Sequence, residues 1–290
     1  MNTLKITDMR INPGDAGYLI QTPDCALLYD TGFGFTGREM AEKVKEVLGD
    51  KALDYILLTH SHYDHVLATP HILRLYPNAK VIAGEYAVKI FAKDSAKALM
   101  RKLDKEAALE AGVEEYEDLS DLLHVDVTVK EGDVLKLGDM EFEVIDLPGH
   151  TKCSIAFYCA EKKLLLGCET LGVYNGENDV LPFYLASYRM TLDSIEKAKK
   201  LEIDNILVPH VGYLDRETTR FYLERGEKNA LQVAEQIVQR VKSGVDDEAI
   251  FEEFKSRFYK GKMVEMYPLQ AMILNTHILI GVVKKEFGLE

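Results

Sequence analysis

The sequence lacks any run of eighteen apolar residues, so we expect no membrane-spanning helix. Its start, Met1–Asp8, lacks the basic and then apolar layout of a signal peptide. Cysteine is scarce, and no two cysteines have the Cys-x-x-Cys spacing. Because Cys25, Cys153, Cys159 and Cys168 lie in apolar stretches, we expect buried free thiols. Without an export signal, we expect the protein to be located in the reducing cytoplasm.

Basic residues are also in short supply. The chain has 35 Lys and Arg against 48 Asp and Glu, which gives a formal charge of −13 and a pI near 5.2. The electrostatic field of a protein with this negative charge repels phosphates, so we expect no nucleic-acid partner and no anionic membrane partner. The length of 290 residues and the hydrophobic content of 47% are those of an ordinary globular protein with one large domain and an appendage, or two domains.

The pattern of apolar residues predicts alternating strands and helices. Apolar runs closed by turn residues predict strands at 17–22, 25–30, 54–58, 80–83, 125–129, 134–137, 141–147, 154–159, 163–167 and 205–208. Helical spacing predicts helices at 37–49, 69–76, 191–201, 215–243, 247–258 and 267–286. Residues 84–123, rich in Ala, Lys, Glu and Leu, predict two more helices inserted over the core. This order favours two half-units, each a sheet covered by helices, with the sheets face to face.

The strongest chemical signal is the segment Thr59–His65, directly after a predicted strand. It holds three imidazoles and one carboxylate, on His60, His62, Asp64 and His65. Both groups are ligands for zinc, iron or manganese. One short segment can hardly wrap four donors around a single tetrahedral ion. The spacing therefore predicts that His60 and His62 serve one metal, and that Asp64 and His65 serve a second metal beside it.

Three other predicted strands also end at a side chain that can bind a metal. His150 follows strand 141–147, Glu169 follows 163–167, and His210 follows 205–208. Layered α/β proteins tend to place ligands at the carboxyl ends of their strands. We therefore expect these three side chains to join the histidine-rich segment in one metal site.

These residues resemble the metallo-β-lactamase superfamily over roughly residues 3–212. The resemblance is carried by Asp30-Thr31-Gly32, His60–His65, Pro148-Gly149-His150-Thr151, Glu169-Thr170-Leu171 and His210, in that order. It implies an α/β protein with an αββα four-layer sandwich and a dinuclear site at one edge. Residues 1–212 would form the metal-binding domain, with the helical insertion at about 84–123. Residues 213–290 would form a C-terminal helical extension.

The resemblance also implies a ligand set with three ligands for each ion and one between them. Metal 1 takes His60, His62 and His150, metal 2 takes Asp64, His65 and His210, and Glu169 takes the bridging carboxylate position. The family usually has Gly-Asp-Thr-Leu there, whereas this chain has Gly-Cys-Glu-Thr-Leu at residues 167–171. The carboxylate is thus one residue later and one methylene longer. It could bridge the ions, bind one ion alone, or act beside the ligands.

Two further residues have roles left open by the sequence. The resemblance implies that Asp30 lies beside the site as a partner of a ligand histidine, and the alternative is a simple turn cap. Tyr174, five residues after Glu169, is a candidate donor to an oxyanion, and the alternative is a packed loop tyrosine.

The expected chemistry is hydrolysis by a hydroxide that bridges two divalent metal ions. Asp64 would be both a ligand and the catalytic group that orients the hydroxide and passes a proton to the leaving group. Zinc is the expected metal, with iron and manganese as alternatives. The expected enzyme is a metallo-β-lactamase-fold hydrolase of a small ester, thioester or lactone. The alternatives are a phosphodiesterase of the same fold, a mononuclear iron persulfide dioxygenase, and a non-catalytic metal-binding protein.

The expected partner is a small-molecule substrate. Residues 266–283 are more apolar than a lone exposed helix tolerates. We therefore expect this helix to dock on the main domain, or on a second subunit in a homodimer built through the C-terminal helices.

Overall fold

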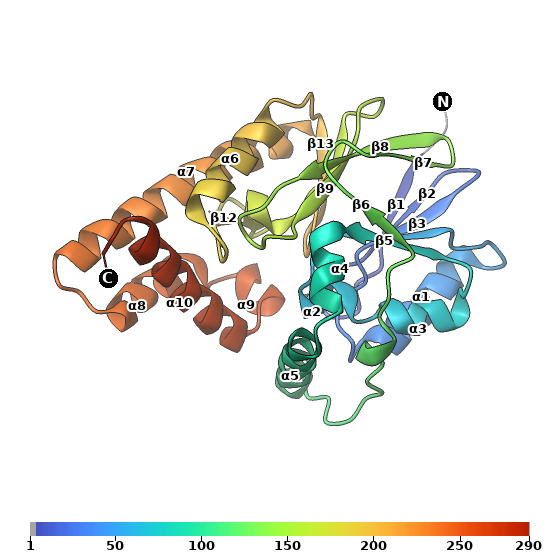
Figure 1. The fold of residues 1–290 in the computed structure, drawn as a ribbon, viewed down its shortest axis with the longest axis horizontal. Helices are drawn as coiled ribbons and strands as arrows, with labels where there is room; N and C mark the ends of the chain where they lie inside the picture. The colour runs from blue at the N-terminus through green and yellow to red at the C-terminus, as the bar shows by residue number, and fades with distance from the viewer. Residues whose placement is uncertain (1–3, 290) are drawn as a thin grey trace.

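Two six-stranded sheets lie face to face in the computed structural model, with helices on the outer face of each (Figure 1). The strand order is β1-β2-β3-β4-β5-β6 in the first sheet and β14-β13-β10-β9-β8-β7 in the second. The structure describes residues 4–289. Residues 1–3 and 290, at the outer ends of the two predicted domains, lie outside the described residues.

The strands are short, and those that the sequence predicted lie close to their predicted positions. The first sheet contains β1 (Lys5–Asp8), β2 (Tyr18–Gln21), β3 (Ala26–Tyr29), β4 (Tyr55–Leu58), β5 (Lys80–Gly84) and β6 (Val127–Val129). The second contains β7 (Val134–Leu137), β8 (Met140–Asp146), β9 (Ile155–Cys159), β10 (Leu164–Leu166), β13 (Asn205–Val208) and β14 (Gly212–Leu214). A separate pair is formed by β11 (Val173–Tyr174) and β12 (Val180–Leu181).

The helices fall into a sandwich set and a C-terminal set. The first set is α1 (Gly37–Leu48), α2 (Tyr63–Val66), α3 (Thr69–Leu75), α4 (Glu85–Phe91), α5 (Asp94–Glu110) and α6 (Tyr188–Lys199), with short 3₁₀ turns η1 (Ser120–Leu122) and η2 (Glu169–Leu171). The second set is α7 (Arg216–Lys242), α8 (Asp247–Phe258), α9 (Lys262–Met266) and α10 (Leu269–Glu286).

Neighbouring residues of the central strands belong to different layers of the core. In β3, Leu28 packs beneath α1 and α3, whereas Leu27 and Tyr29 face the second sheet. In the second sheet, Leu165 and Ile206 pack beneath α6 and α7. Both faces of these strands are therefore buried, which explains their continuous apolar runs. The four layers confirm the predicted αββα sandwich.

The structure differs from the sequence prediction mainly where the chain is half exposed. Within 84–123, α4 and α5 form as predicted, but α5 ends at Glu110 and the chain turns at Gly112, whose φ of 79° is left-handed. β1 was not predicted, because this edge strand is only partly buried and its residues do not stand out as an apolar run.

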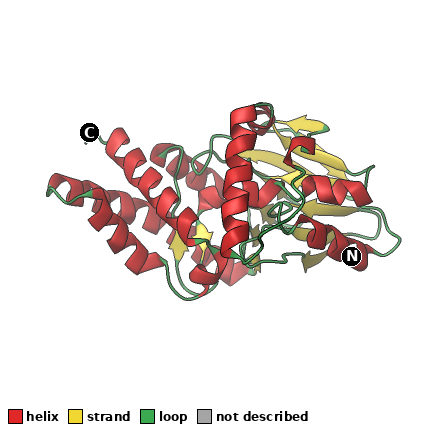
Figure 2. Cartoon of the chain, turned by 90° about the horizontal axis from the view of Figure 1, so that it is seen from below, coloured by secondary structure: helices red, strands yellow, loops and turns green. Residues whose placement is uncertain are grey.

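The C-terminal helices extend away from the sheets (Figure 2). The apolar segment of α10 buries Met272, Leu279 and Ile280 against α7 and α8, so it docks within its own chain. The homodimer stays a prediction. So does the division into two domains, whose boundary at residue 212 falls on the first residue of β14. Among residues 4–289, no helix combines the length and apolarity needed to cross a bilayer.

Candidate metal centre

The histidine-rich segment leaves β4 and forms a loop followed by the single-turn helix α2. The loop carries His60 and His62, and α2 carries Asp64 and His65. His60 and His65 are fully buried, whereas Asp64 keeps 15% of its side chain exposed. The short helix turns the chain so that neighbouring positions can face one point from different directions.

The three remaining candidates arrive from the second sheet. His150 follows β8, Glu169 opens the turn η2 after β10, and His210 follows β13. Together with the histidine-rich segment they form two groups, in each of which the donor atoms lie within 4.8 Å of one another. One group is His60, His62, His150 and Glu169, and the other is Asp64, His65 and His210. The structure therefore brings together all seven side chains predicted as ligands.

Glu169 lies between the two groups. Its Oε2 atom lies 2.9 Å from Nε2 of His150 and 3.4 Å from Nε2 of both His60 and His65. Its Oε1 atom lies 3.4 Å from Nε2 of His210. Burial alone would raise the pKa of Glu169, but the surrounding imidazoles outweigh it and hold that pKa well below its usual value. The carboxylate is thus ionised and touches both groups.

In three of the histidines, a hydrogen bond at Nδ1 fixes the orientation of the ring. Nδ1 of His65 donates to Asp30 over 2.9 Å, and Nδ1 of His150 donates to the carbonyl of Phe183 over 2.8 Å. Nδ1 of His210 faces the carbonyl of Asp15 at 3.2 Å. Because these oxygens can only accept, each Nδ1 carries a proton and each Nε2 faces the centre, where the neutral form of the ring presents a lone pair.

Asp30 orients two of the ligand histidines. Its carboxylate accepts from the backbone N–H and the hydroxyl of Thr59, at 2.9 and 2.8 Å, and from His65. The Thr59 oxygen in turn lies 3.0 Å from Nδ1 of His60 and accepts its proton. Asp30 has a φ of 52° and His210 a φ of 64°, a conformation that costs about 1–3 kcal/mol for a residue with a side chain.

The buried imidazoles differ in their affinity for protons. Burial, and then the neighbouring imidazoles, lower the pKa of both His60 and His62 well below its usual value. Burial also opposes protonation of His65, but the carboxylates of Asp64 and Asp30 outweigh it and hold the pKa of His65 well above its usual value. His60 and His62 are therefore neutral near pH 7, the form in which imidazole binds metals.

The centre contains polar atoms whose bonding is incomplete. Nε2 of His60, His65 and His210 and Oε1 of Glu169 are buried and form no hydrogen bond within the described part of the chain. Burying such atoms unpaired costs free energy, and ordinary cores avoid it. Cations held by the two groups would satisfy all four atoms. Imidazole nitrogens and carboxylate oxygens fit zinc, iron or manganese, so the residues present fit divalent metal ions.

The oxyanion role considered for Tyr174 is not supported by the geometry. Its hydroxyl donates to the carbonyl of Glu177 over 2.9 Å, and its ring packs against Phe221 and Tyr222 of α7. Only 6% of Tyr174 is exposed. It is the packed loop tyrosine that the sequence offered as the alternative, because η2 and β11 direct it toward α7.

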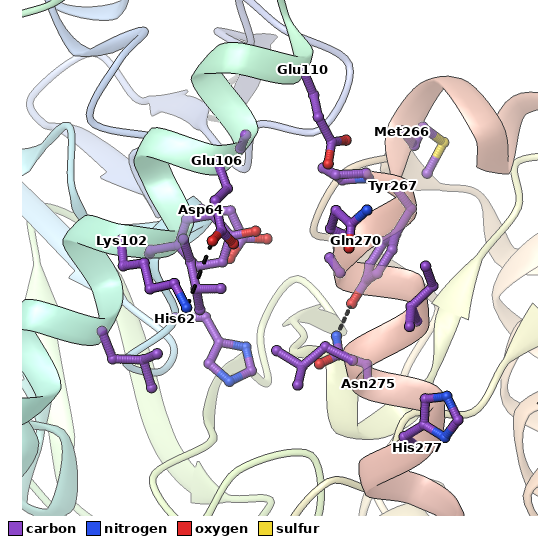
Figure 3. Close-up of a pocket in the computed structure, with 18 residues that line it drawn as sticks. His62, Asp64, Lys102, Glu106, Glu110, Met266, Tyr267, Gln270, Asn275 and His277 are labelled. Atoms are coloured by element: carbon purple, nitrogen blue, oxygen red, sulfur yellow. Dashed lines mark hydrogen bonds and ion pairs between the residues drawn. The ribbon is translucent and has the colours of Figure 1, made fainter. Parts of the chain in front are cut away.

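A groove of about 520 Å³ opens beside the metal centre, and the sequence did not predict it. His62 and Asp64 lie on its lining together with residues of α5 and α10 (Figure 3). Tyr267 also lines it, and Nδ2 of Asn275 donates to its hydroxyl oxygen over 2.5 Å. No sequence signal marks Tyr267, because it follows the motif by two hundred residues and reaches the site only through the turn between α9 and α10.

Residues 16–210 match the model of the metallo-beta-lactamase superfamily. This stretch is well over half of the 290 residues, and the chain belongs to that superfamily. The resemblance inferred from the motifs is thereby confirmed. Members of the family typically bind divalent metals, and the two groups of donors described above could do so here.

Curated relatives match only part of the chain. A hydroxyacylglutathione hydrolase of Francisella tularensis subsp. novicida is 28% identical over 152 residues, which are 52% of this chain and 46% of that protein. Glyoxylase B2 of Dictyostelium discoideum is 26% identical over 154 residues, which are 51% of this chain and 48% of that protein. The chain thus spans about half the length of these relatives.

Solved structures share the fold over nearly the whole chain. An archaeal metallo-beta-lactamase superfamily protein from Sulfolobus tokodaii has a TM-score of 0.62 at 18% identity, covering 98% of this chain and 99% of that one. A metallo-beta-lactamase family protein from Thermus thermophilus has a TM-score of 0.63 at 18% identity, covering 94% and 88%. At such identities the likeness shows the fold alone.

Proposed function

We propose that the protein is a metal-dependent hydrolase that cleaves a small ester, thioester or lactone at a centre of two divalent metal ions. The observation that carries this proposal is the convergence of seven donor side chains, with Glu169 in contact with both groups. Membership of the superfamily and relatives named as hydrolases support it. Zinc is the proposed metal.

In this proposal His60, His62 and His150 hold one ion, Asp64, His65 and His210 hold the other, and Glu169 lies between them. Two divalent cations, when bound, lower the pKa of water and stabilise negative charge on a substrate oxygen. The chain's own contribution begins with orientation. Asp30, directly and through Thr59, fixes which nitrogens face the centre before any metal or substrate arrives.

Asp64 is the proposed acid–base group. Its Oδ2 atom lies 3.7 Å from Nε2 of His210 and 3.8 Å from Nε2 of His65, so this oxygen faces the second group of donors. The side chain also borders the groove, where a substrate would lie. Asp64 can therefore orient the attacking water, accept its proton, and deliver a proton to the leaving oxygen or sulfur.

Tyr267 is the proposed donor to the oxygen of the reacting carbonyl. Asn275 occupies the hydroxyl oxygen of Tyr267 as a donor, and no acceptor among the described residues takes the hydroxyl hydrogen. Burial, and then the nearby Glu169 and Asp64, raise the pKa of Tyr267 well above its usual value, so the phenol keeps its proton. Tyr267→Phe should lower kcat by about a hundredfold with little change in KM. If the variant instead had a raised KM and an unchanged kcat, the result would contradict this role.

Metal analysis combined with a substrate panel tests the proposed function. Two zinc or manganese ions per chain and turnover of an ester, thioester or lactone are expected. One ferrous ion with oxygen uptake would instead identify a persulfide dioxygenase, and turnover of phosphodiesters alone would identify a phosphodiesterase. Two bound ions with no turnover in the whole panel would favour a non-catalytic metal-binding protein.

His62→Ala tests the assignment of the first donor group. Loss of one ion and of turnover is expected, because this change removes a donor that lies 3.0 Å from Nε2 of His150. His124→Ala is the matched control, since His124 is an exposed histidine that contacts the carbonyl of Leu122. Unchanged metal content in His62→Ala would refute the assignment.

A further inference from the structure

The groove beside the metal centre has two apolar walls. One wall is a face of α5 and the other is a face of α10 (Figure 3). Its aliphatic lining residues are Leu99, Leu103 and Ala107 on α5, and Ala271, Ile273 and Leu274 on α10. A volume of about 520 Å³ lies in the range of small-molecule sites. The groove therefore has room for an aliphatic chain beside the metal centre.

Several of these apolar side chains are exposed to solvent. Leu99 is 55% exposed and Leu274 is 43% exposed, although both belong to well-formed helices. Exposed aliphatic surface that lines a concave site becomes favourable once a ligand covers it. The same groove reaches His62 and Asp64, so a ligand that covers this surface would lie next to the metal centre.

The charges on the groove are mainly negative. Among the described lining residues the one Lys or Arg is Lys102, and its ammonium lies 3.7 Å from Glu106. Glu110 adds a further carboxylate, whereas that of Asp64 belongs to the proposed metal ligands. Apart from the proposed metal ions, an anionic substrate would therefore meet no unpaired cation in the groove.

We propose that the groove selects a neutral ester, thioester or lactone that carries an aliphatic chain, with the chain between α5 and α10 and the carbonyl at the His62 and Asp64 end. This inference rests on the proposed function. In the reaction, water adds to the carbonyl carbon, the C–O or C–S bond breaks, and the leaving oxygen or sulfur takes a proton. The products are a carboxylate and a neutral alcohol or thiol, joined in one hydroxy acid when the substrate is a lactone, and the second proton of the water is released to solvent. The groove carboxylates that disfavour anionic substrates also favour departure of the carboxylate product.

The glutathione thioesters implied by the names of the curated relatives are a different class. Their carboxylates outnumber their ammonium group, so they are anionic near pH 7. A matched comparison is available, because the same acyl group can be carried on glutathione or on neutral N-acetylcysteamine. The acyl chain then tests the apolar walls, and the thiol tests the charge of the groove.

The first measurement is kcat/KM of the metal-loaded enzyme for N-acetylcysteamine thioesters from acetyl to octanoyl. We expect an increase of about fourfold per methylene until the groove is filled. At low salt the glutathione thioester of the same acyl group should be about tenfold poorer, and added salt should narrow the difference. The double variant Glu106→Gln, Glu110→Gln should also narrow the difference in kcat/KM between the two thioesters.

The second measurement needs neither metal nor turnover. Metal-depleted protein is titrated with methyl ketones of increasing chain length, and Kd should fall by about fourfold per methylene. Leu274→Ala should weaken binding of the longest ketone by about threefold to tenfold. Leu231→Ala is the matched control, because Leu231 is 45% exposed on α7, away from the groove. It should change nothing.

The two measurements separate the two proposals. Ketone binding that strengthens with chain length, without turnover of any thioester, ester or lactone, supports the groove assignment and refutes the hydrolase. Turnover that is independent of chain length, or that favours glutathione thioesters, refutes the groove assignment and leaves the hydrolase standing. Equal effects of Leu274→Ala and Leu231→Ala would also refute the groove assignment.

Discussion

Asp30→Asn is expected to weaken metal binding at both groups of donors without altering the fold. The Asp30 carboxylate accepts from His65 directly and from Thr59, whose oxygen accepts from His60. Asparagine has nearly the same volume and tolerates the left-handed backbone at this position, so the φ of 52° is kept. The change therefore removes the charge and one acceptor, and little else.

The magnitude follows from the hydrogen bonds that are lost. A buried hydrogen bond to a charged group contributes about 1.5–3 kcal/mol, and loss of a partner that orients a ligand typically costs about 10- to 100-fold in metal affinity. We expect that loss in zinc affinity, measured by competition with a fluorescent chelator. Urea unfolding of the metal-free proteins checks that Asp30→Asn leaves the fold intact.

Thr59→Val separates the two branches of this network. Valine keeps the backbone N–H that donates to Asp30 and leaves the bond from His65 in place, but it removes the link to His60. One zinc ion should then bind more weakly while the other is nearly unaffected. Zinc affinities of Asp30→Asn within twofold of wild type would refute the role assigned to Asp30.

Two further predictions concern Glu169 and Asp104. Glu169→Asp shortens the carboxylate that touches both groups of donors. Elemental analysis should then find one of the two ions lost, and kcat should fall at least about tenfold. Full metal occupancy and unchanged turnover would show that the longer side chain is incidental. Burial raises the pKa of Asp104 from 3.8 to about 7, so between these values the folded state holds a proton that the unfolded state has released. The free energy of unfolding should therefore fall as pH rises, by about 2–3 kcal/mol from pH 5 to pH 8. Urea unfolding of Asp104→Asn should not show this fall in the free energy of unfolding. An identical pH dependence in the wild type and the variant would contradict the prediction.

Much of the site could be predicted because it follows from strand ends. A strand fixes where its last residue points, and all six ligands carried over from the family pattern without change follow the end of an apolar strand: His60, His62, Asp64, His65, His150 and His210. Tyr267 could not be predicted in this way. It ends α9 in an extended conformation just before Pro268, and only the packing of α10 on α7 and α8 brings it to the groove.

The path of the chain after β10 explains how Glu169 reaches the metal centre although it lies one residue later than the carboxylate of the family pattern. β10 ends at Leu166, and Cys168 then points into the apolar core of the second sheet, fully buried near Tyr222. Burial there raises the pKa of its thiol to about 12, and a carboxylate at that position would likewise be disfavoured in its ionised form. The turn η2 directs the next side chain, Glu169, back to the metal centre. The extra residue and the extra methylene therefore act together, because the turn sets the direction and the longer side chain supplies the reach.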